Sequence, residues 1–130
     1  MRALLGCAVL GLSLFASTAC GSSAPSCADA GKPLLDSIAA GAKGHAVQMG
    51  SGKTLKMADR DNVYLVAAKV RIAGGAERVG VWTTSNLGGE GEILNVDAAA
   101  KTATSYGDSA TGGAKVAAGD EAVGKVKACL

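Results

Sequence analysis

Aromatic residues, prolines and histidines are scarce in this chain of 130 residues. It has four aromatic side chains, two prolines and one histidine, and its 13 basic and 11 acidic residues leave a net charge of only +2. This near balance of charge excludes the dense basic surface that nucleic-acid binding requires. A single histidine also leaves little material for a histidine-based metal site or catalytic triad.

Small and aliphatic residues are abundant instead. The chain has 19 glycines, and 48% of its residues are hydrophobic although only 3% are aromatic. Length and composition suit one domain and exclude a collagen-like repeat, a coiled coil and a polytopic membrane protein. The core must therefore be built mainly from Val, Leu, Ile, Met and Ala.

The first twenty residues have the pattern of a targeting segment. Met1-Arg2 is positively charged, and the segment 3–16 that follows is uncharged and rich in Ala and Leu. This pattern is typical of a signal peptide, and the apolar run is too short for a permanent bilayer-spanning helix. Ser17-Thr18-Ala19-Cys20, followed by a Gly/Ser-rich stretch, resembles the lipobox of bacterial lipoproteins, although that family more often has Leu at the position of Ser17.

In that family the cysteine receives diacylglycerol and becomes the mature N-terminus. The resemblance implies a lipoprotein signal peptide over 1–19, a lipidated Cys20 with a flexible spacer over 20–31, and one extracytoplasmic domain over 32–130. The membrane is then a partner through the lipid on Cys20, because two or more acyl chains anchor a protein firmly. The alternative is an ordinary secretory peptide, with Cys20 a free thiol or a disulfide partner.

The remaining cysteines predict a disulfide bond. Cys7 leaves with the predicted signal peptide, so Cys27 and Cys129 remain once Cys20 carries the lipid. Outside the cytoplasm such a pair usually oxidises. Neither cysteine belongs to a metal-ligand set or a Cys-x-x-Cys motif, and we predict neither a metal nor another cofactor.

Hydrophobic patterning predicts an α+β fold, with a small antiparallel sheet covered mainly on one face. The expected elements are strands near 63–73, 78–85 and 92–96, and helices near 33–42, 97–105 and 119–129. The strand at 63–73 is apolar on both sides over its first half and is expected to be central. A loose hairpin is expected over 47–57, turning at Gly50-Ser51-Gly52. Asp97 and Asp120 are predicted to cap the two later helices.

Three short motifs resemble parts of functional signatures, and each lacks required residues. Gly-Ser-Gly-Lys-Thr at 50–54 resembles the end of a P-loop, but Val47 stands where that motif has Gly, which favours a glycine-rich turn. Gly-Asp-Ser at 107–109 resembles the nucleophile segment of trypsin-like proteases and of GDS-type lipases. The lone histidine, His45, leaves no triad, and a polar surface loop is expected. The segment 59–62 resembles a partial calcium loop and is interpreted as an acidic turn.

The aromatic residues of the predicted domain allow two interpretations. Tyr64, Trp82 and Tyr106 can form an exposed patch that grips a sugar or a partner. With so few rings available, we expect them to fill the core instead, with their polar ends at its edge.

Three apolar stretches, 63–70, 79–85 and 93–97, resemble small actinomycete lipoproteins of unknown function. The similarity covers most of residues 45–130. It implies a compact extracytoplasmic domain with a C-terminal cysteine, and it implies no activity.

The sequence thus predicts a lipid-anchored binding or interaction module at the cell envelope, whose partner is a protein or an envelope ligand. One alternative is an inhibitor- or immunity-like module for a secreted enzyme. Its mark is a rigid exposed loop, for which 86–92 and 107–113 are candidates. The least favoured alternative is a small envelope enzyme that uses Glu90, Glu92 and Asp97 for acid–base work.

Overall fold

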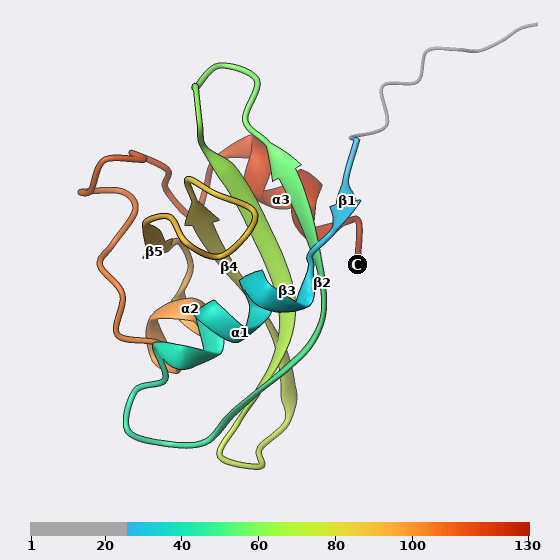
Figure 1. Ribbon diagram of the computed structural model, residues 1–130, viewed down its shortest axis with the longest axis vertical. Helices are drawn as coiled ribbons and strands as arrows, with labels where there is room; N and C mark the ends of the chain where they lie inside the picture. Colours follow the sequence, from blue (N-terminus) through green and yellow to red (C-terminus); the bar gives the residue numbers. More distant parts are fainter. Residues whose placement is uncertain (1–25) are drawn as a thin grey trace, which may run out of the picture.

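A five-stranded antiparallel sheet organises residues 26–130, the part of the chain that the computed structural model describes. Its strands follow one another in the order β1 (Ala28–Asp29), β2 (Val47–Lys56), β3 (Tyr64–Ile72), β4 (Glu77–Thr84) and β5 (Ile93–Asn95). The helices that flank it are α1 (Lys32–Ala40), α2 (Ala98–Ala103) and α3 (Glu121–Lys127) (Figure 1). The predicted α+β class is confirmed, and its elements lie close to the expected ranges. Cys20 and the predicted signal peptide lie outside the described residues.

The central strand β3 is buried on both faces. Its side chains alternate, so Leu65 and Ala67 point to one face while Val66, Ala68 and Val70 point to the other. The central position predicted from this two-sided pattern is confirmed.

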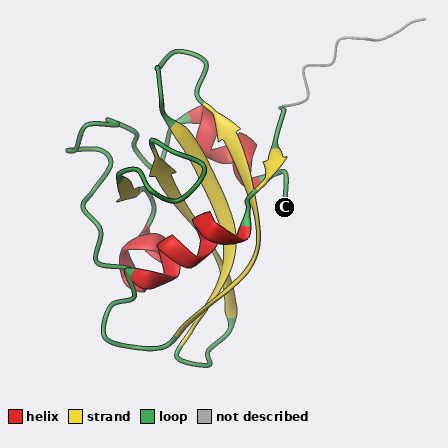
Figure 2. Cartoon of the chain, viewed as in Figure 1, coloured by secondary structure: helices red, strands yellow, loops and turns green. Residues whose placement is uncertain are grey.

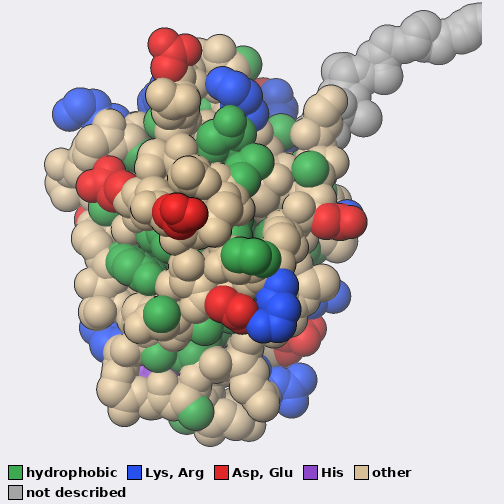
Figure 3. Space-filling view, viewed as in Figure 1, with side chains coloured by type: hydrophobic (Ala, Val, Ile, Leu, Met, Phe, Trp, Pro, Cys, Tyr) green, Lys and Arg blue, Asp and Glu red, His purple; other side chains and the backbone are tan. Residues whose placement is uncertain are grey.

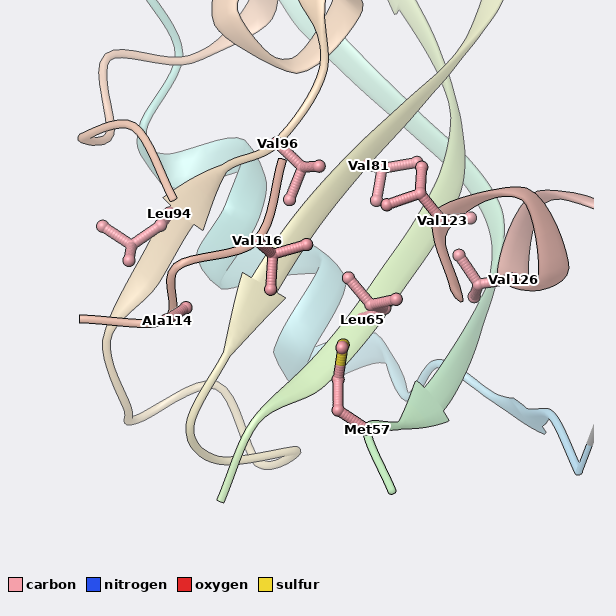
Figure 4. Packing of buried hydrophobic residues seen from close by; sticks show 10 residues of the cluster. Met57, Leu65, Val81, Leu94, Val96, Ala114, Val116, Val123 and Val126 are labelled. Carbon is pink, nitrogen blue, oxygen red and sulfur yellow. The ribbon is translucent and has the colours of Figure 1, made fainter. Parts of the chain in front are cut away.

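The expectation that helices cover mainly one face is wrong, because each face of β3 requires a cover. Helix α3 covers one face with Val123 and Val126 and forms the α3-side core (Figure 4). Helices α1 and α2 cover the other face and form the α1/α2-side core. That core contains Leu34, Ile38, Ala100 and Ala103 together with Trp82 of β4 and the apolar residues of β3.

Strand β2 runs through the glycine-rich segment without turning, so the predicted hairpin over 47–57 is wrong. Gly50 and Ser51 form a β-bulge, where two residues of β2 lie opposite Lys69 of β3. At Gly52 a Cβ atom would lie 3.1 Å from the Ala67 carbonyl oxygen and 3.1 Å from the Ala68 Cβ. Glycine here permits the close approach of neighbouring strands, a role that sequence alone does not distinguish from a turn.

Strand β1 lies within the segment predicted as a flexible spacer. Ala28 pairs with Thr54 and Asp29 with Lys53. The hydrogen bond from the Lys53 ammonium to Asp29 holds the pKa of that carboxyl below its usual range. The predicted disulfide between Cys27 and Cys129 is confirmed, with the two Cα atoms 6.4 Å apart. It joins the start of β1 to the end of the chain after α3.

The two predicted helix caps differ in outcome. Asp97 caps α2 as expected, since its Oδ1 accepts a hydrogen bond from the Ala100 N–H at 2.9 Å. Asp120 occupies the cap position of α3, but its carboxylate accepts from the Ala117 N–H before the helix. That side chain therefore fastens the preceding loop rather than the first turn of α3.

Candidate interaction surface

The residues of the P-loop-like and calcium-like motifs serve structural roles. The segment 50–54 belongs to β2, and Lys53 forms an ion pair with Asp29 instead of facing a phosphate-binding loop. The segment 59–62 is the turn between β2 and β3, as expected. Its Arg60 donates from Nη1 to the backbone carbonyls of Ala114 at 2.7 Å and Lys115 at 2.8 Å. No group of His, Cys, Asp or Glu side chains within residues 26–130 is arranged to hold a metal ion.

Ser109 does not lie on a polar surface loop, so that expectation is wrong for this residue. Its side chain is fully buried, and its hydroxyl donates to the Val116 carbonyl. The neighbouring Asp108 is partly exposed, and the hydrogen bond from Lys101 holds the pKa of its carboxyl below the usual range. The Ser109 hydrogen bond and the Asp108–Lys101 ion pair hold the α2–α3 connection (residues 104–120) in place. The Ser109 hydroxyl is buried, so it is not accessible to act as a nucleophile.

Trp82 is fully buried, which confirms the prediction that this ring fills the core. Its indole Nε1 donates to the Thr104 hydroxyl at 3.0 Å, and that hydroxyl donates to the Asn95 side-chain oxygen. The Asn95 amide in turn donates to the carbonyls of Thr104 at 3.1 Å and Tyr106 at 2.7 Å. Buried polar groups that are all satisfied in this way stabilise one arrangement of β4, β5 and α2. The sequence analysis missed this network; its signal is an Asn between the apolar residues Leu94 and Val96.

The other two rings are only partly buried. Tyr106 donates from its hydroxyl to the Ser37 carbonyl, and burial raises the pKa of that hydroxyl. Tyr64 is half-buried, with the Lys56 ammonium 5.8 Å from its ring centroid. The three aromatic side chains therefore do not form the exposed patch considered as an alternative.

The three carboxylates considered for acid–base catalysis have different surroundings. Asp97 is buried and accepts hydrogen bonds from the backbone N–H groups of Val81 and Ala100. Glu90 and Glu92 are exposed on the loop between β4 and β5. Asp97 therefore serves the fold, which removes one member of the proposed acid–base set.

The β4–β5 loop (residues 85–92) presents the one large hydrophobic side chain that is exposed among the described residues. Leu87 is 41% exposed at the tip of this loop. On the face seen in Figure 3, hydrophobic side chains are scattered among charged and neutral groups rather than gathered in one patch. An isolated exposed leucine is ordinary on a protein surface. Whether Leu87 is suited to bind a partner therefore depends on how well ordered its loop is.

Hydrogen bonds within the β4–β5 loop hold it in one conformation. The Thr84 hydroxyl donates to the Asn86 carbonyl at 3.0 Å and accepts from the Asn86 N–H at 3.2 Å. The Asn86 side-chain oxygen accepts from the Gly88 N–H at 2.6 Å, which closes a turn around Leu87. At the other end, the Glu92 N–H donates to the Ser85 hydroxyl at 2.9 Å.

Helix α1 supports the loop from below through Gly89. This residue has a φ of 89°, and a Cβ atom there would lie 2.5 Å from the Ser37 hydroxyl and 2.7 Å from the Pro33 carbonyl oxygen. Only glycine combines that conformation with so close a contact. The loop thus packs closely against α1 at Gly89, two residues from the exposed Leu87.

The two loops that the sequence analysis singled out line one common hollow. A hollow of about 210 Å³ is lined by Ser85 and Glu92 of the β4–β5 loop and by Gly113 and Ala114 of the α2–α3 connection. The α2–α3 connection runs beside β5, at the sheet edge opposite β1 (Figure 2). We define the candidate interaction surface as the β4–β5 loop together with this hollow.

Neither the helices of the described residues nor similarity to known proteins adds a functional assignment. Within residues 26–130, no helix has both the length and the apolar character needed to cross a bilayer. Comparison of the chain with protein-family models, with curated proteins and with solved structures finds no match.

Proposed function

We propose that this protein is a lipid-anchored, extracytoplasmic lipoprotein that binds a protein partner at the cell envelope through its candidate interaction surface. The observation that carries the binding proposal is the rigid β4–β5 loop with Leu87 exposed at its tip. A loop already held in its bound shape loses little conformational entropy on association. Leu87 is 41% exposed, so burial of the part that is still in contact with water contributes about 1 kcal/mol.

The lipid anchor is supported by the lipobox-like segment that ends at Cys20 and by the disulfide between Cys27 and Cys129. Disulfides of this kind persist in oxidising compartments and are rare in the cytosol. The rigid loop also favours a more specific candidate, an inhibitor- or immunity-like module whose partner is a secreted enzyme. In that case the loop enters the partner's cleft.

Labelling of living cells with a palmitate analogue tests the anchor. We expect the wild-type protein to incorporate label and to fractionate with the membrane, because acyl chains on Cys20 partition into the bilayer. Cys20→Ala should abolish both. An unlabelled wild-type chain that is soluble in the cytoplasm with its leader uncut contradicts the proposal.

Crosslinking in intact cells, followed by identification of the captured proteins, tests the interaction surface. We expect Leu87→Asp to reduce capture of the partner at least several-fold, since a charge replaces the apolar side chain at the tip. Gly89→Ala should act similarly, because its Cβ would push the loop away from α1.

Ala76→Asp provides a matched control, since it places the same charge on the exposed turn between β3 and β4. Equal capture by the wild-type, Leu87→Asp and Ala76→Asp proteins would show that the β4–β5 loop is not the contact. Capture of a hydrolytic enzyme that the wild-type protein inhibits would favour the inhibitor-like candidate.

A further inference from the structure

The two edges of the sheet are protected unequally. Along β5, Asn95 donates to the Gly107 carbonyl at 2.7 Å and accepts from the Ser109 N–H at 2.8 Å, so the α2–α3 connection covers that edge. Along β2, strand β1 pairs only with Lys53 and Thr54, and the Ala30 N–H reaches Gly52. On the side away from β3, residues 47–51 of β2 have no neighbouring strand in the described part of the chain, as Figure 1 shows for the lower half of β2.

The pairing register shows which backbone groups this open edge presents. The Ala73 N–H donates to the Ala46 carbonyl at 2.7 Å, which makes Ala46 and Ala73 a hydrogen-bonded pair. Such pairs alternate with non-bonded pairs along an antiparallel ladder. Val47 and Met49 therefore form non-bonded pairs with β3, and their N–H and C=O groups point away from it. Each copy of the protein presents four backbone groups with no partner among the described residues.

The side chains of this segment do not block strand addition. Natural edges are commonly protected by Lys or Pro, and residues 47–52 contain neither of these and no other charged side chain. The bulge at Gly50 and Ser51 ends the regular edge, so the open stretch is short. Val47 and Met49 pack partly against the α1/α2-side core, whereas Gln48 is exposed on the opposite face.

We propose that residues 47–49 of β2 pair antiparallel with the same residues of a second copy, about a two-fold axis at Gln48. In this register Val47 lies opposite Met49 of the second copy, and each pair exchanges two hydrogen bonds. The contact uses all four open groups of both copies, and the paired residues 47–49 carry no charge, which is why the same segment fits better than a charged peptide. It is isologous and therefore closes as a dimer. Because the contact is short, the dimer is weak and reversible.

Cysteine crosslinking at Gln48 tests this arrangement in the full-length protein. Gln48 would form a non-bonded pair with Gln48 of the second copy, with Cα atoms about 4.5 Å apart. That separation lies within the range of about 4.4 to 6.8 Å that a disulfide spans. We expect Gln48→Cys to form a covalent dimer several-fold more efficiently than Glu77→Cys, an exposed control position on β4.

A second variant tests the proposed hydrogen bonds by removing the Met49 N–H, which points away from β3. Met49→Pro removes an N–H that β3 does not use, so in the Gln48→Cys background it should return crosslinking to the level of Glu77→Cys. If Met49→Pro prevents folding, sedimentation of the Gln48→Lys and Glu77→Lys proteins replaces it, and only Gln48→Lys should weaken self-association. Crosslinking at Gln48 no stronger than at Glu77, or crosslinking only to a different protein, would overturn the proposal.

Discussion

Replacement of Cys27 or Cys129 by serine is expected to lower the free energy of unfolding by about 4 to 5 kcal/mol. The disulfide joins residues with a sequence separation of 102, so its loss frees almost the whole domain in the unfolded state. The entropy of closing so long a loop sets this magnitude. The elements that the disulfide joins contribute little stability of their own. Strand β1 has only two residues, and Gly124 lies in the interior of α3, where glycine disfavours a helix.

Urea unfolding of both single variants and of the double variant measures this loss. All three should be destabilised equally, because each lacks the same bond. Wild-type protein reduced under native conditions provides the matched control, since it keeps both side chains and loses only the crosslink. A loss below about 1 kcal/mol in every case would contradict the chain-entropy argument.

Replacement of Asp97 by alanine should destabilise the domain by about 3 kcal/mol or more. The Asp97 carboxylate accepts from the Val81 N–H at 3.1 Å and from the Ala100 N–H at 2.9 Å, and all three groups are buried. Each donor left unsatisfied costs about 1 to 3 kcal/mol. The ion pair with Lys127 at 3.3 Å contributes little, because the lysine is half-exposed.

Two further variants, compared with Asp97→Ala in denaturant titrations, test the role of the Asp97 hydrogen bonds. Asp97→Asn keeps an acceptor oxygen and should cost clearly less than Asp97→Ala. Asp120→Ala removes another aspartate at a helix start, but its single exposed bond to Ala117 predicts a loss of about 1 kcal/mol or less. Equal losses for Asp97→Ala and Asp120→Ala would refute the role assigned to the buried carboxylate.

The sequence predicts best where a local pattern has one structural solution. The apolar residues on both faces of β3 identify a central strand, and Asp97 before an alanine-rich run identifies a helix cap. Even there the pattern is incomplete. Nothing local indicates that Asp97 also accepts from Val81 of a neighbouring strand, because that bond depends on how α2 lies against the sheet.

The failures arise where glycine or a short segment has several solutions. Gly50-Ser51-Gly52 is compatible with a turn and with a bulge, and the continuation of β3 beside it selects the bulge. The two residues of β1 carry no strand signal, since their place is set by the disulfide and by pairing with β2. For the candidate interaction surface, sequence analysis located both loops, but Leu87 and the support of Gly89 by α1 emerged only from the fold.

The disulfide also determines how the domain carries mechanical load. Tension applied at Ser26 reaches Cys27 before it reaches β1, and the disulfide passes part of it to Cys129, which follows α3. Without that bridge, a two-residue strand would peel from the sheet one pair at a time. With it, β1 and α3 must be pulled away together, so the buried side chains of Val123 and Val126 share the force.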